Sequence, residues 1–211
     1  MYGPTLTGDR ICLEPPSAAL AELYCGWFGD TMVNLYTHRF PPSLNTATEW
    51  VEEAEKSEKH VLWMVTLDGQ PIGMAQVDTI NWHHRHADIA LILGVQALWG
   101  KGYGTEAVRL MTRFTFEELN LEKLTGEAIV ENTGSVRAME KAGFRQWGLA
   151  RKHFYQAGHW SDVWLGRYCA MSGARLARRA EQAPPPGVRA ATHSSRGSGL
   201  HTSGGQSRTR S

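Results

Sequence analysis

The feature that most constrains what this chain can fold into is a loop of alternating glycines at residues 100–104, Gly-Lys-Gly-Tyr-Gly. An apolar run at residues 89–93 precedes it and an amphipathic segment follows, so this order predicts a strand, a loop and a helix. Because glycine has no Cβ, backbone N–H groups in such a loop can approach a ligand closely. The helix N-terminus adds unpaired N–H groups and the positive end of its dipole. The loop therefore predicts a phosphate-binding site, and a tight turn without a ligand is the alternative.

The spacing of these glycines differs from that of the two common nucleotide loops. A nucleoside-triphosphate loop ends in Gly-Lys-Ser/Thr, whereas Lys101 lies between the first two glycines. A dinucleotide-binding fold has Gly-x-Gly-x-x-Gly after its first strand, whereas this loop reads Gly-x-Gly-x-Gly and lies near the middle of the chain. Both of these ligand classes therefore fit the loop poorly.

A second motif downstream narrows the interpretation. Residues 132–135 read Asn-Thr-Gly-Ser, and residues 140–144 read Glu-Lys-Ala-Gly-Phe. Together with the glycine loop, this pair of motifs resembles the GCN5-related N-acetyltransferase (GNAT) family, in the branch of the ribosomal-protein N-terminal acetyltransferases RimJ and RimL. The resemblance covers about residues 8–168. Trp99 stands where that family usually has Arg or Gln, while Gly102 and Gly104 match its pyrophosphate-binding pattern.

The resemblance implies both a fold and an activity. The implied fold is α/β, with a mixed, mostly antiparallel central sheet of six to seven strands, flanked by helices and splayed at the acetyl-CoA site. The implied reaction is direct attack of a primary amine on acetyl-CoA, the co-substrate, in a ternary complex without a metal. The acceptor is a protein N-terminal amine or a small-molecule amine, and relatives are commonly homodimers. A non-catalytic CoA-binding module for sensing or interaction is the alternative.

The same resemblance implies which residues bind acetyl-CoA. The backbone of the strand end contacts the pantetheine arm, the loop holds the pyrophosphate, and the Asn-x-x-Ser motif contributes an amide and a hydroxyl. The residues concerned are Leu93, Val95, Trp99, Gly100, Lys101, Gly102, Tyr103, Gly104, Thr105, Asn132 and Ser135.

Three residues are candidates for proton transfer. The Ser135 hydroxyl is expected to donate to the departing thiolate, with an ordinary helix N-cap as the alternative. Asp88 occupies the strand position where relatives often carry Glu, so it is the candidate general base, acting directly or through water. A solvated carboxylate at a strand start is the alternative for Asp88. Glu127 on the next strand is the second candidate for the base, and His153 is a further one.

Composition limits the partners. Four of the 22 Lys and Arg residues lie after Ala183, where there is no acid, so the preceding chain is mildly acidic. This balance argues against a nucleic-acid partner and is compatible with a cationic amine. Three scattered cysteines without metal-ligand spacing, no signal peptide and no long apolar run indicate a cytoplasmic protein without a membrane partner. A metal site at His83, His84 and His86 is disfavoured because no second ligand cluster is apparent.

The chain is expected to contain one domain and a tail. Residues 1–180 form the predicted N-acetyltransferase domain, and residues 181–211 are Pro/Gly/Ser/Arg-rich and predicted to be disordered. Ser17 is the expected cap of a first helix, and Thr46-Ala47-Thr48-Glu49 fits a capping box that opens a second one. Further helices are predicted at residues 104–119 and 135–142, and strands at residues 9–14, 61–67, 72–77, 87–93, 124–130, 144–151 and 163–168.

Overall fold

The computed structural model describes residues 1–37, 40–156 and 158–170. The predicted tail at residues 181–211, and the boundary near residue 180, lie outside this range. The helices are α1 (Leu20–Gly29), α2 (Thr31–Asn34), α3 (Leu44–Lys56), α4 (Tyr103–Glu117) and α5 (Thr133–Lys141), with a 3-10 turn η1 (Gln96–Leu98). The strands are β1 (Leu6–Thr7), β2 (Ile11–Glu14), β3 (Val61–Leu67), β4 (Gln70–Asn81), β5 (His86–Leu93), β6 (Lys123–Ile129), β7 (Arg145–Gln156) and β8 (His159–Cys169).

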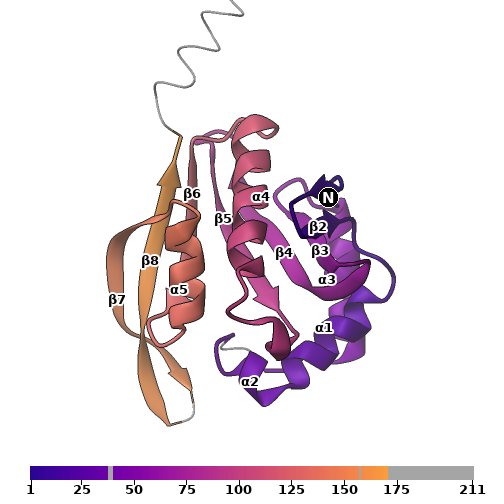
Figure 1. Ribbon diagram of the computed structural model, residues 1–211, viewed down its shortest axis with the longest axis horizontal. Helices are drawn as coiled ribbons and strands as arrows, with labels where there is room; N and C mark the ends of the chain where they lie inside the picture. The colour runs from indigo at the N-terminus through magenta and orange to yellow at the C-terminus, as the bar shows by residue number, and fades with distance from the viewer. Residues whose placement is uncertain (38–39, 157, 171–211) are drawn as a thin grey trace, which may run out of the picture. The chain divides into compact units, whose positions relative to one another are not determined.

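The strands form one mixed sheet in the order β1-β2-β3-β4-β5-β6-β8-β7 (Figure 1). Every neighbouring pair is antiparallel except β5 and β6, which are parallel. The predicted mixed, mostly antiparallel α/β sheet is therefore confirmed, with eight strands in place of the predicted six to seven. Strand β1 was not predicted, because a strand of two residues is too short to show an alternating pattern.

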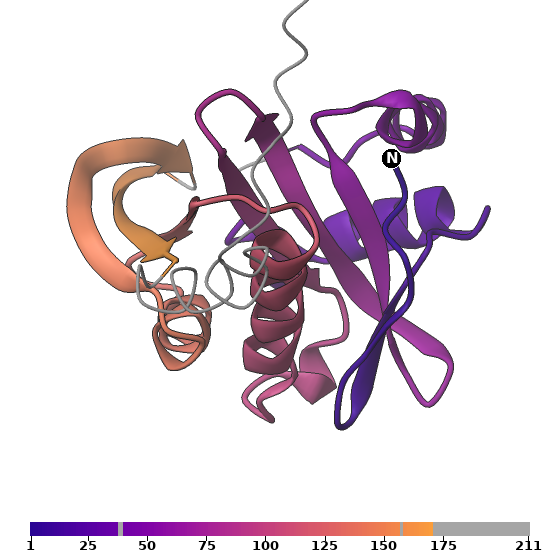
Figure 2. The ribbon, with the colours of Figure 1, turned by 90° about the horizontal axis from the view of Figure 1, so that it is seen from above.

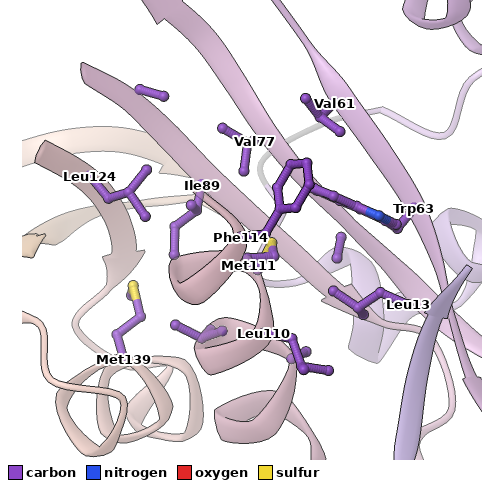
Figure 3. Packing of buried hydrophobic residues seen from close by; sticks show 14 of the residues in the cluster. Leu13, Val61, Trp63, Val77, Ile89, Leu110, Met111, Phe114, Leu124 and Met139 are labelled. Atoms are coloured by element: carbon purple, nitrogen blue, oxygen red, sulfur yellow. The ribbon is translucent and has the colours of Figure 1, made fainter. Parts of the chain in front are cut away.

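Helices cover both faces of this sheet, with α4 and α5 on one face and α1 and α3 on the other (Figure 2). Beneath α4, the Trp63 ring is fully buried and meets the Phe114 ring edge-on at 5.3 Å between centroids (Figure 3). The Trp63 indole N–H donates to the Pro4 carbonyl at 2.9 Å, so its one polar atom is satisfied. This packing fixes α4, and with it the glycine loop, on the sheet.

Two predicted helix caps are wrong. Helix α1 begins three residues after Ser17, with Ala19 at the N-cap and no side-chain cap. Helix α3 begins at Leu44, where the Ser43 hydroxyl accepts from the Thr46 N–H at 3.1 Å. Several Ser and Thr residues here can cap a helix, and the choice among them depends on how the helix packs against the sheet.

The sheet opens between β5 and β6. Their pairing is limited to three residue pairs and ends at Asp88 and Thr125, after which β5 pairs only with β4 and β6 only with β8. The predicted splay is therefore present, and it begins five residues before Leu93. Of the helices in the described part of the chain, none is long and apolar enough to cross a membrane.

Candidate active site

A cavity of about 1060 Å³ lies at the opening of the sheet. Residues 88–93 of β5 and residues 125–129 of β6 line it, so it occupies the space between the separated strands. The glycine loop and α5 contribute one part of the wall, and α1, α2 and α3 contribute another. One continuous cavity thus reaches both helical layers of the protein, which allows two substrates to meet inside it.

The free edge of β5 faces this opening. The Gly94 N–H donates to the Ile72 carbonyl at 2.9 Å, so even-numbered residues of β5 exchange their backbone hydrogen bonds with β4. Leu91 and Leu93 therefore direct their N–H and C=O groups to the opposite edge of β5, where β6 no longer pairs with it. The Leu93 carbonyl accepts from the Trp99 indole N–H at 2.8 Å. An extended ligand can pair with the remaining groups as an additional strand would.

The N-terminus of α4 meets the cavity with unused hydrogen-bond donors. Asp30, Ser43 and Asn132 cap α2, α3 and α5 with their side chains, whereas Gly102, the N-cap of α4, has no side chain to do so. The first bond into this helix runs from the Glu106 N–H to the Gly102 carbonyl, which leaves the N–H groups of residues 103–105 unpaired within the helix. Gly102 and Thr105 line the cavity. This arrangement fits the diphosphate of acetyl-CoA.

The predicted acetyl-CoA residues divide into two groups. Those that line the cavity are Leu93, Trp99, Gly100, Gly102, Thr105, Asn132 and Ser135. Those that do not are Val95, Lys101, Tyr103 and Gly104, of which Gly104 lies where a Cβ would contact Leu91 and Ala138. For both groups a role in binding acetyl-CoA stays a prediction, which for the first group is supported by its place at the cavity.

The Asn-x-x-Ser motif begins α5 beside the cavity. Asn132, not Ser135, is the N-cap, because its Oδ1 accepts from the Ser135 N–H at 3.1 Å. The prediction of Ser135 as a possible cap is therefore wrong, and its half-buried hydroxyl is not used for capping. With one lone pair of Oδ1 engaged, the Asn132 amide still has its NH₂ group and a second lone pair to offer to a ligand.

Asp88 lies at the point where β5 and β6 separate. The Thr79 hydroxyl donates to its Oδ2 at 2.5 Å, and the Thr125 hydroxyl donates to its Oδ1. Thr79 has a φ of 50°, which is unusual for a β-branched residue, and it lies in a bulge of β4. The bulge brings this hydroxyl to Asp88. The carboxylate is thus held in one orientation and retains lone pairs for a further donor.

Other acids share this face of the sheet. Asp78 on β4 pairs with Asp88, so the two side chains lie on the same face of the sheet. On β6, Thr125 also pairs with Asp88. Glu127 lies two residues further along β6, so its side chain lies on that face too. Asp78, Asp88, Glu127 and Glu131 all line the cavity. We call the first three the acidic floor. The basic residues of the lining, Arg137 and Lys141, lie on α5 instead.

Aromatic side chains also line the cavity, and we call them the aromatic wall. They are Tyr24, Phe28, Tyr36, Trp50, Trp147 and Phe154. Trp50 stacks on Tyr24 at 5.1 Å between centroids, so it packs α3 against α1 and also lines the cavity. Trp27 is buried against Gly94, and Trp82 is exposed and donates to the Glu58 carbonyl, so neither lines the cavity. Acids and aromatic rings in one cavity are typical of sites that bind organic cations.

His60 lies behind Trp50 and is buried. Its Nε2 lies 3.1 Å from the Gln76 Oε1, which requires a proton on Nε2. Burial lowers the pKa of His60, and this effect outweighs those of Asp78 and Gln76, which raise it. The folded protein therefore holds a neutral imidazole where the unfolded chain would take up a proton.

A pH-dependent loss of stability follows from this histidine. As the pH falls below about 6.5, protons bind to the unfolded chain first, so the free energy of unfolding decreases until the pH reaches the folded pKa. The slope from this one group is at most about 1.4 kcal/mol per pH unit. Urea unfolding at about pH 7.5 and about pH 5.5 measures it. The variant His60→Gln should lose this part of the pH dependence, and an unchanged dependence would contradict the assignment.

The histidines singled out in the sequence do not line the cavity. His153 is exposed on β7 and does not line the cavity, so it is not placed to act as the base. His83, His84 and His86 lie near one another at the turn between β4 and β5. Across the described residues, no group of three or more His, Cys, Asp or Glu side chains is arranged to hold a metal ion.

A splayed sheet, a free strand edge and an uncapped helix N-terminus at one cavity are the features expected of an α/β acyltransferase that binds a CoA thioester. A family model for the acetyltransferase (GNAT) domain matches residues 10–145, and the chain therefore belongs to the GNAT acetyltransferase family. It is accordingly an acetyl-CoA-dependent acyltransferase.

Individual relatives agree with this family. The chain is 38% identical over 117 residues to the probable N-acetyltransferase YjcK of Bacillus subtilis, a match that spans 54% of this chain and 64% of that protein. It is 27% identical over 142 residues to the spermidine N(1)-acetyltransferase of Escherichia coli, with 61% and 76% covered. The fold is similar to that of spermidine N-acetyltransferase from Vibrio cholerae in complex with CoA and spermine, with a TM-score of 0.71, 21% identity, and 76% and 96% covered.

Proposed function

We propose that this protein transfers the acetyl group of acetyl-CoA to a primary amine of a small organic cation. The observation that carries the proposal is the acidic floor, because three carboxylates face one cavity beside the splay where the thioester is expected. Carboxylates attract an ammonium group, and the aromatic wall adds cation–π contacts. A protein N-terminal amine, which the RimJ/RimL-like motifs suggest, is the alternative acceptor.

The proposed reaction is direct attack in a ternary complex. Acetyl-CoA supplies the acetyl group as a thioester. Asp88 takes a proton from the ammonium group, directly or through a water molecule, so that the amine nitrogen becomes nucleophilic. The new C–N bond forms as the C–S bond breaks. The Ser135 hydroxyl donates its proton to the departing thiolate and is reprotonated by the second proton that the nitrogen loses as it becomes an amide, directly or through water. Support for these roles comes from the positions of both side chains in one cavity.

The test is an assay for free thiol with acetyl-CoA and a panel of amines. The panel contains polyamines, an aminoglycoside, a neutral amine and peptides with free N-termini, and mass spectrometry identifies each product. We expect acetylation of small amines that carry two or more positive charges, with kcat/KM well above that of the neutral amine. Turnover of the peptides alone would favour the alternative acceptor. Tight CoA binding without turnover of any amine would favour a non-catalytic CoA-binding module.

Glu127 is expected to set the preference for a cation. Replacing it with glutamine removes one charge from the acidic floor and keeps the shape of the side chain. The KM for a cationic amine should rise about tenfold, the loss expected for one hydrogen bond to a charged group, while kcat changes little. Glu53→Gln is the matched control, since Glu53 is exposed on α3 and does not line the cavity. A fall in kcat with unchanged KM would contradict this role.

A further inference from the structure

The turn between β1 and β2 lies directly against the first turn of α4. The Gly8 N–H donates to the Ile11 carbonyl at 2.9 Å and closes this turn. A Cβ at Gly8 would lie 2.5 Å from the Oε1 of Glu106 and 2.9 Å from the Ile11 carbonyl oxygen. The glycine thus allows the backbone of the turn to pack on the Glu106 carboxylate.

Glu106 is held by three hydrogen bonds from this turn. Its Oε1 accepts from the backbone N–H groups of Arg10 at 2.8 Å and Ile11 at 3.2 Å, and its Oε2 accepts from the Arg10 Nε at 3.0 Å. The Glu106 side chain is only 13% exposed. Burial alone would raise the pKa of this carboxyl, but the three hydrogen bonds together hold it below its usual value. Glu106 is therefore an anion that fixes the position of Arg10.

From Glu106 the Arg10 side chain continues to the glycine loop. Its Nη1 donates to the Lys101 carbonyl at 2.8 Å. Its guanidinium carbon lies 4.7 Å from the centre of the Tyr103 ring. Between these two contacts, a Cβ at Gly102 would lie 3.1 Å from the Arg10 Nη2. One arginine thus contacts three consecutive residues of the loop, although it is 91 positions away from Lys101 in the sequence.

The hydrogen bond from Arg10 to the Lys101 carbonyl determines the direction in which the Gly102 N–H points. In a trans peptide the C=O of one residue and the N–H of the next point in opposite directions. Because Arg10 holds the Lys101 carbonyl, the Gly102 N–H points away from Arg10, and Gly102 lines the cavity. Gly102 has a φ of 92°, and Gly100 has a φ of 74°, so the loop uses a backbone conformation that glycine adopts readily. Without Arg10 this peptide unit would be free to rotate.

We propose that Arg10 and Glu106 are positioning residues for acetyl-CoA, because they hold the peptide between Lys101 and Gly102 in the orientation that presents its N–H to the diphosphate. Neither side chain lines the cavity, so both act through the loop. The inference rests on the proposed function for the identity of the ligand.

The test compares two acetyl donors. S-acetylpantetheine carries the same thioester as acetyl-CoA but has no diphosphate, so it does not use the loop. In the full-length variants Arg10→Met and Glu106→Gln, the KM for acetyl-CoA and the Kd for CoA should rise about tenfold, the equivalent of one charge-assisted hydrogen bond. The value of kcat/KM with S-acetylpantetheine should stay within about twofold of the original protein.

A second arginine provides the matched control. Arg85 donates to the Asn120 carbonyl and pairs with Glu122 at 3.3 Å, so it has the same kinds of contact at a site away from the loop. Arg85→Met should leave kcat/KM unchanged with both acetyl-CoA and S-acetylpantetheine. An equal loss of kcat/KM with both acetyl donors in Arg10→Met and Glu106→Gln would indicate general destabilisation and overturn the inference. An unchanged Kd for CoA in both variants would also overturn it. Titration of CoA needs no acceptor, so weakened CoA binding would support the inference even if no amine is acetylated.

Discussion

Replacing Asp88 with asparagine is expected to lower kcat about a hundredfold, the lower range for loss of a general base. Asparagine keeps the shape of the side chain but cannot take a proton from an ammonium group. Since Asp88 lies where β5 and β6 separate, its loss should affect the chemical step more than the binding of either substrate. The Kd for CoA should be unchanged.

The control for this experiment is Asp68→Asn. Asp68 lies in the hairpin turn between β3 and β4 with a φ of 51°, a conformation that asparagine also adopts, and it does not line the cavity. Its kinetics should match those of the original protein. If Asp88→Asn instead kept kcat/KM together with its pH profile, Asp88 would not be the base. Glu127 would then be the remaining candidate from the sequence.

Replacing Trp63 with alanine is expected to lower the free energy of unfolding by about 3–5 kcal/mol. The side chain is fully buried beneath α4, so its removal leaves a cavity beside Phe114 and leaves the Pro4 carbonyl without its donor (Figure 3). For a chain of this size the corresponding fall in Tm is roughly 10 °C. Urea and thermal unfolding measure both quantities.

Trp160→Ala makes the same change at a surface position. Trp160 is 54% exposed on β8, so its loss should cost less than about 1 kcal/mol. Trp63→Phe is the intermediate change at the buried site, because it keeps one aromatic ring but removes the second ring of the indole together with its N–H, and its loss should lie below that of Trp63→Ala. A loss for Trp63→Ala no larger than that for Trp160→Ala would show that the core relaxes around the missing ring.

The elements close to the motifs were well predicted, because their signals are local. The predicted strands at residues 61–67, 72–77 and 87–93 and the predicted helices at residues 104–119 and 135–142 are all present, with bounds that differ by a few residues. Caps were predicted less well. Ser17, Thr46 and Ser135 can each cap a helix, and packing selects other positions.

The candidate site residues likewise divide into those with a local signal in the sequence and those that only the packing brings together. The glycine loop, Asp88 and Glu127 were found from the sequence, because a motif or a strand position identified them. Asp78, Thr79 and Thr125 were not, since they lie on β4 and β6 and come to Asp88 on β5 only through strand pairing and a bulge. Arg10 and Glu106 gave no signal either, because nothing in a single sequence relates a turn near the start of the chain to a helix in its middle.

By itself, the sequence determined that this chain has a strand, a glycine loop and a helix in that order, because hydrophobic periodicity and the conformational freedom of glycine are local signals. It also determined the family, through two motifs in the expected order. Only the tertiary structure decided that the sheet opens after Asp88, that carboxylates from β4, β5 and β6 share one cavity, and that Arg10 holds the loop. These features depend on which strands pair and in which register, and that choice is made by packing over the whole domain.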